Sequence, residues 1–179
     1  LAFLRQYRNE LFPNTPIVSI TTRRPSSREV NAGPGLTGVT TLSNHRKTID
    51  LALRLHPDTK EILVISGTLQ HDKRLETAAR EELQGYEGRV QFSYLTDLSP
   101  DELIAKTKTL SRQSLILYIW QQVQDEKGRI LETQDILSSI ARSASVPIYG
   151  MTNLYIGTGA VGGYINTAEA TGARAGETV

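Results

Sequence analysis

The sequence contains no cysteine among its 179 residues, which excludes disulfide bonds and thiolate metal sites. It also lacks an excess of charge of one sign, since 20 Lys and Arg stand against 19 Asp and Glu, a formal net charge of +1. This balance provides no electrostatic footprint for nucleic acid or for an anionic membrane, so we expect no nucleic-acid partner. No apolar run approaches the roughly 20 residues that span a bilayer.

Aromatic residues are scarce, at 6%, and only one of them is Trp. Hydrophobic residues make up 39% of the chain and charged residues 22%, which is ordinary for a globular protein. The length suits one domain, or one domain with pieces of a second. The first residue is not Met, no signal peptide is visible and the last residues are polar. We therefore expect the sequence to be part of a longer protein.

Short apolar runs alternate with amphipathic segments along the chain. Strands are expected at 15–20, 36–42, 60–67, 88–96, 114–120 and 146–150. Helices are expected at 1–12, 43–57, 69–86, 100–111 and 133–143, with the start of another after 165. The clearest helix start is Ser99-Pro100-Asp101-Glu102, a capping box with Pro at the first helical position. Continuously apolar strands separated by helices predict an α/β fold: an open parallel sheet with helices on both faces.

In such a sheet, ligands bind beyond the carboxyl ends of the strands. Four segments follow the predicted strands: 67–72, 95–97, 120–122 and 150–153. They provide hydroxyl, amide, imidazole and carboxylate groups and the only Trp, a mixture that suits a small polar molecule with an apolar part. Trp120 ends its strand, where it is equally compatible with a pocket wall and with an ordinary core residue.

Three other patterns have chemical interpretations that the sequence disfavours. Gly157, Gly159 and Gly162 match G-x-G-x-x-G, but an extended-looking segment follows them where a dinucleotide site needs a helix. We interpret these glycines as a crossover where backbones approach closely, and we expect no cofactor. His71 and Asp72 lie close to Thr68, but no G-x-S-x-G elbow accompanies them, so we expect no catalytic residue.

Metal ligands are not expected either. Asp125, Glu126 and Asp135 lack the alternating oxygen ligands of a calcium loop, and the three His residues are widely scattered along the chain.

Three stretches carry a resemblance to a known family: "GVTTLSNHRKTIDLALRLHPDTKEILVISGT", "LYIWQQVQDEKGRILETQDILSSIARSASVPIYG" and "YIGTGAVGGYINTAEATGARAGE". The chain resembles the periplasmic binding protein-like (type 1) fold. More narrowly, it is similar to ABC-transporter substrate-binding proteins of uncharacterised type, whose domains also occur as extracytoplasmic sensors of bacterial histidine kinases. The resemblance covers about residues 1–179, and its motifs are patterns of small residues.

The resemblance implies two α/β lobes that close around a ligand in the cleft between them. Residues 1–42 would be a fragment of the first lobe and crossover, and 43–152 the second lobe. Residues 153–179 would form the hinge crossover, including the glycine-rich segment, and the start of a first-lobe helix. About a hundred upstream residues of the family pattern are missing, so the chain is expected to be a fragment of a two-lobed protein and a possible homodimer.

The function implied is binding without catalysis. We favour an extracytoplasmic (periplasmic) sensor domain, membrane-anchored in the full protein, that binds an amino acid, peptide or similar molecule and signals to a membrane-linked kinase. The alternatives are the substrate-binding component of an ABC transporter with a permease partner, an α/β enzyme acting on a sugar or nucleotide, and an interaction domain without a small ligand. The expected ligand-binding residues are Thr41, Ser43, Thr68, Gln70, His71, Trp120, Gln121, Asn153 and Tyr155.

Overall fold

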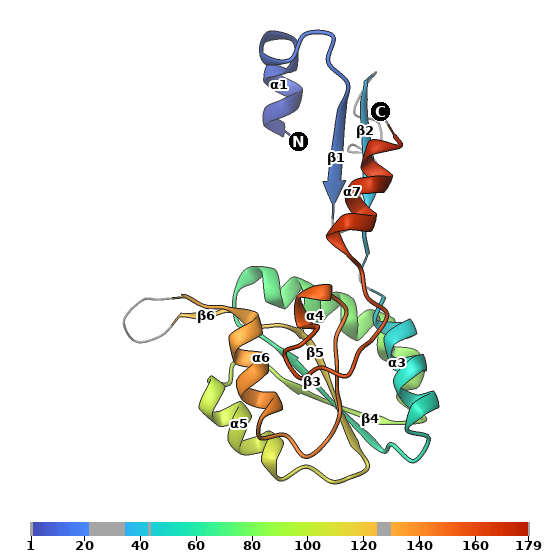
Figure 1. The fold of residues 1–179 in the computed structure, drawn as a ribbon, viewed down its shortest axis with the longest axis vertical. Helices are drawn as coiled ribbons and strands as arrows, with labels where there is room; N and C mark the ends of the chain where they lie inside the picture. The colour runs from blue at the N-terminus through green and yellow to red at the C-terminus, as the bar shows by residue number, and fades with distance from the viewer. Residues whose placement is uncertain (1, 22–34, 43, 125–129, 179) are drawn as a thin grey trace. The chain divides into compact units, whose positions relative to one another are not determined.

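The computed structural model describes residues 2–21, 35–42, 44–124 and 130–178 (Figure 1). The chain divides into two compact units. Unit 1 combines the two ends of the chain, Leu1–Ser43 and Asn166–Val179, and unit 2 is the continuous segment Asn44–Ile165. The chain therefore passes between the units twice.

A four-stranded parallel sheet forms the centre of unit 2. Its strands are β3 (Glu61–Ser66), β4 (Gln91–Leu95), β5 (Ser114–Trp120) and β8 (Ile148–Tyr149). Their spatial order is β4-β3-β5-β8, so the second strand along the chain lies outside the first. The prediction of an open parallel sheet is confirmed.

Helices cover both faces of this sheet, as predicted (Figure 1). They are α3 (His45–Leu55), α4 (Gln70–Leu83), α5 (Pro100–Lys108) and α6 (Thr133–Ala141). The chain moves outward from β3 to β4 through α4 and back to β5 through α5. Because parallel crossovers are right-handed, helices that lead in opposite directions cover opposite faces. Accordingly, α3 and α4 pack on one face and α5 and α6 on the other.

The side chains of the apolar strands point alternately into two separate hydrophobic cores, one on each face of the sheet. In β5, Leu115, Leu117 and Ile119 pack with α3 and α4, whereas Ile116 and Tyr118 pack with α5 and α6. Successive side chains of a strand point to opposite faces, so a strand covered on both sides must be apolar at every position. This explains why β5 shows no polar–apolar alternation in the sequence.

Unit 1 is smaller. It contains α1 (Ala2–Leu11), β1 (Ile17–Thr21), β2 (Leu36–Thr40) and α7 (Ala168–Gly176). The two strands pair in parallel, and α7 contacts both of them. Within the described residues of the whole chain, none of the helices has the length and apolar character needed to cross a bilayer.

One element of unit 2 was not expected from the sequence. A short antiparallel hairpin, β6 (Val123–Gln124) with β7 (Ile130–Leu131), stands where the sequence suggested only a loop. Asp125 and Glu126, weighed above as metal ligands, lie outside the described residues.

The glycine-rich segment also differs from expectation, because it belongs to unit 2. The N–H of Val161 donates to the Ile148 carbonyl (2.8 Å), and the N–H of Gly150 donates to the Gly162 carbonyl (2.9 Å). These bonds hold the segment beside β8, so the second passage between units falls at 165–166 and not after residue 152. A Cβ at Gly163 would lie 1.8 Å from the Gly150 carbonyl oxygen, so here the glycine permits close packing within one unit.

Candidate functional site

The order of the strands places a topological switch point between β3 and β5. From β3 the chain turns outward to β4, and from β5 it continues to the opposite edge. Open α/β sheets bind ligands at the carboxyl ends of the strands on either side of such a point. Here those ends are Gly67 to Asp72 after β3 and Trp120 to Gln122 after β5. Five of the nine residues singled out from the sequence lie in these two segments.

Trp120 is the aromatic centre of this edge. It is the last residue of β5 and is half-buried. Its ring lies 6.4 Å from the exposed His71 ring, edge-on at 89°, and 6.4 Å from the Tyr155 ring. The structure thus brings together three predicted residues from three segments that are far apart in the sequence.

The segment after β3 presents exposed polar side chains. Thr68, Gln70 and His71 are all exposed, and the latter two lie in the first turn of α4. Asp72, by contrast, is completely buried. One of its carboxylate oxygens, Oδ2, accepts the N–H of Leu69, the residue that precedes the helix, at 3.3 Å. A carboxylate at this position also interacts favourably with the helix dipole.

Gly67 allows this arrangement because it has no side chain. A Cβ there would lie 2.1 Å from Asp72 Oδ2 and 3.2 Å from the Gln121 Cα. The Gly67 N–H also donates to the Trp120 carbonyl at 2.9 Å, which ties the two strand ends together. Burial raises the pKa of the Asp72 carboxyl, an effect opposed by the backbone N–H groups of Leu69 and Gln122.

A polar network lies beneath the edge. The Tyr155 hydroxyl donates to the Ile119 carbonyl (2.7 Å), the Tyr118 hydroxyl donates to the Thr133 carbonyl (2.9 Å), and the Gln121 N–H donates to Thr133 Oγ1 (3.2 Å). Burial raises the pKa of both tyrosines, so their hydroxyls stay protonated and act as donors. The network anchors the end of β5 to the start of α6.

Three buried polar atoms at this edge lack a hydrogen-bond partner: Asp72 Oδ1, Trp120 Nε1 and Gln121 Oε1. In the described part of the chain only four buried side-chain atoms are in this condition, and the fourth, His45 Nε2, lies elsewhere. The Gln121 amide is oriented by its Nε2, which donates to the Leu98 carbonyl at 3.2 Å. An unpaired buried polar group costs about 1–3 kcal/mol, and folded proteins leave few buried polar atoms without a partner.

The remaining predicted residues have other surroundings. Thr41 belongs to unit 1, where its Oγ1 lies 3.3 Å from Thr171 Oγ1. Ser43 lies outside the described residues. Asn153 is exposed at the start of the short 3-10 helix η2 (Asn153–Tyr155), and its Oδ1 lies 3.5 Å from Thr152 Oγ1. Gln121 and Tyr155 are 1% and 2% exposed, so they support the edge from below.

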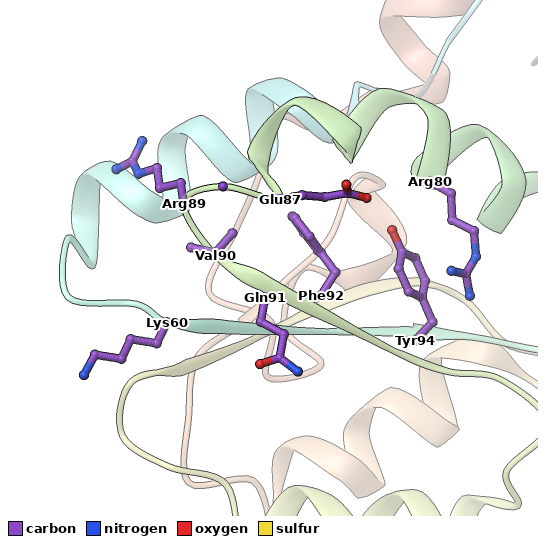
Figure 2. Close-up of a pocket in the computed structure, with 9 residues that line it drawn as sticks. Lys60, Arg80, Glu87, Arg89, Val90, Gln91, Phe92 and Tyr94 are labelled. Atoms are coloured by element: carbon purple, nitrogen blue, oxygen red, sulfur yellow. The ribbon is translucent and has the colours of Figure 1, made fainter.

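Two concave regions accompany the sheet. One, of about 210 Å³, is lined by Tyr155, Thr152 and the glycine-rich segment, and so adjoins the candidate site through the Tyr155 side chain. The other, of about 540 Å³, runs along β4 at the edge of the sheet (Figure 2).

The sequence analysis did not select Asp72 or Thr133 for this site. Asp72 carried a usable signal, because an acidic residue three positions after a helix cap is a recognised pattern. Thr133 carried none beyond its place at a helix start. Within the described ranges, no group of three or more His, Asp or Glu side chains could hold a metal ion.

Comparison with known proteins gives no further guide to this site. No protein-family model, curated protein or solved structure matches the chain.

Proposed function

We propose that the carboxyl-end edge between β3 and β5 binds a small polar molecule with an apolar part, such as an amino acid or short peptide. One observation carries this proposal: at the topological switch point of the sheet, exposed Thr68, Gln70 and His71 follow β3, and the His71 ring lies 6.4 Å from the ring of Trp120 at the end of β5. The ligand would stack on the indole and exchange hydrogen bonds with the polar side chains.

The biological role proposed is the one that the resemblance implies: an extracytoplasmic sensor domain of a bacterial histidine kinase, with an ABC-transporter binding component as the alternative. Two features support a binding domain of this kind. The chain passes twice between two compact units, and unit 2 is a parallel α/β unit. Closure of two lobes around the ligand stays a prediction. The reading frames on either side of this sequence distinguish the roles, since a sensor requires a membrane helix and a kinase domain.

Trp120 provides a direct test of binding because it is the only Trp in the chain. Amino acids, short peptides and sugars are screened by thermal shift, and each hit is titrated while Trp emission is recorded. A bound ligand should raise the melting temperature and change the emission at the same concentration. No shift across the whole set, or turnover of any compound, would overturn the proposal.

Two variants test whether the ligand binds at this edge of the sheet. His71→Ala removes an exposed imidazole 6.4 Å from the Trp120 ring, and we expect it to weaken binding about tenfold. Glu81→Ala removes an exposed side chain further along the same helix and should bind as the wild type does. Equal affinities in the two variants would place the ligand elsewhere.

A further inference from the structure

The two edge strands of the sheet in unit 2 differ in whether another backbone segment bonds to their outer side. The edge strand β8 is covered, because Val161 and Gly162 bond to Ile148 and Gly150 through their backbones. Among the described strands, the opposite edge strand, β4, pairs with β3 alone. Within the described residues, no backbone hydrogen bond is made on its outer side.

The unpaired backbone groups of β4 can be assigned to particular residues. Gln91 donates its N–H to the Lys60 carbonyl at 2.8 Å, so Gln91 points its backbone groups inward to the sheet. In a parallel pair the N–H and C=O of alternate residues face the same neighbour. Phe92 and Tyr94 therefore direct their N–H and C=O groups outward, where they form a template for a further strand.

The concave region of about 540 Å³ lies along this same edge (Figure 2). Phe92 and Tyr94 are half-buried there, and the Arg80 guanidinium stacks 3.4 Å from the centre of the Tyr94 ring. The lining therefore offers apolar ring surface directly beside the unpaired backbone groups.

The charged residues of the lining are mostly basic: Lys60, Arg80 and Arg89 against Glu87. Arg80 is engaged by Glu76, with Nε–Oε1 at 2.7 Å. Lys60 and Arg89 have no ion-pair partner within the described part of the chain. This region thus combines unpaired backbone groups and aromatic rings of β4 with two cations, Lys60 just before β3 and Arg89 just before β4.

We propose that the outer edge of β4 binds an extended acidic segment of a partner protein, which adds to the sheet as a fifth strand. Backbone hydrogen bonds to Phe92 and Tyr94 would provide affinity, and alternate acidic side chains would meet Lys60 and Arg89. A second copy of this chain, paired through β4, is the alternative occupant, and the sedimentation experiment below distinguishes it. This site is separate from the carboxyl-end edge and does not depend on the function proposed above.

The test uses the full chain and a short labelled peptide of alternating glutamate and threonine. Fluorescence anisotropy gives the affinity and its dependence on salt, and amide NMR shifts locate the contact. We expect shifts at Phe92 and Tyr94, weaker binding at higher salt, and loss of binding when alternate peptide nitrogens are methylated.

Paired charge reversals provide the matched control. Lys60→Glu with Arg89→Glu should weaken binding at least tenfold. Lys106→Glu with Lys108→Glu makes the same change of net charge at exposed positions on α5 and should leave the affinity unchanged. Circular dichroism confirms that both proteins fold.

Three outcomes would overturn the proposal. They are the absence of binding, equal binding of the corresponding lysine peptide, and self-association of the protein through β4 in sedimentation experiments, which would make a second copy the occupant.

Discussion

At the scale of single residues, burial separates supporting side chains from those that can contact a ligand. His71 and Gln70 are exposed, whereas their neighbour Asp72 is completely buried and holds the first turn of α4. Gln121 and Tyr155 were both expected to contact a ligand, and both are used inside the protein, through Leu98 and Ile119. Their residue types alone could not reveal this internal role, because amide and phenol groups can hydrogen-bond a bound ligand as well as a buried group of the protein.

His45 gives a prediction about pH. Its side chain is 1% exposed, and its Nδ1 lies 3.1 Å from Oε2 of Glu82, which projects from α4. Burial lowers the pKa of His45, and Glu82 only partly opposes this effect. Below pH about 6.5 the unfolded chain therefore binds a proton that the folded protein does not, so stability should fall as the pH drops below that value.

The measurement is urea unfolding between about pH 5 and pH 8. His45→Gln should be destabilised relative to the wild type at high pH, and this difference should shrink as the pH falls. The matched control is His71→Gln, which replaces an exposed imidazole and should follow the wild-type profile. A constant difference between His45→Gln and the wild type across the range would contradict the assignment.

At the scale of elements, local signals predicted the helices and strands of unit 2 closely. The segment 114–120 was expected as a strand and forms β5 with the same bounds. The capping box before α5 is also confirmed: Ser99 Oγ accepts the Glu102 N–H at 3.3 Å, and Glu102 Oε2 accepts the Ser99 N–H at 2.8 Å. These signals depend on neighbouring residues, so they can be recognised in the sequence without knowledge of the tertiary structure. The β6–β7 hairpin was missed because strands of two residues carry no periodicity.

The capping box gives a prediction about stability. Ser99→Ala removes the acceptor for the Glu102 N–H and should cost about 1 kcal/mol of unfolding free energy. Ser99→Thr keeps a hydroxyl at the same position and should retain most of the wild-type stability. Chemical unfolding of the three proteins measures the difference. Equal losses in both variants would mean that packing at residue 99, and not the cap, is responsible.

At the scale of the whole molecule, unit 2 contains everything that the candidate edge requires. It is one continuous segment, Asn44–Ile165, with a separate core on each face of its sheet. Unit 1 combines the two ends of the chain. Because both cores are complete within residues 44–165, unit 2 has the properties of an independent domain.

We therefore expect residues 44–165 to fold alone. The shortened protein should unfold in one cooperative transition and retain the Trp120 emission of the full chain. Thermal unfolding followed by circular dichroism and by fluorescence tests this directly. A broad transition with solvent-exposed Trp emission would show that unit 2 needs the two ends of the chain.

The sequence by itself determined the α/β class, the order of the longer helices and strands in unit 2 and the capping of α5, because periodicity, apolar runs and caps are properties of neighbouring residues. Only the tertiary structure decided the strand order β4-β3-β5-β8, and with it the position of the switch point and of the open edge. The same holds for the glycine-rich segment, whose place beside β8 follows from a close backbone contact between Gly163 and Gly150. Such contacts join residues distant in sequence, and no local pattern encodes which strands become neighbours.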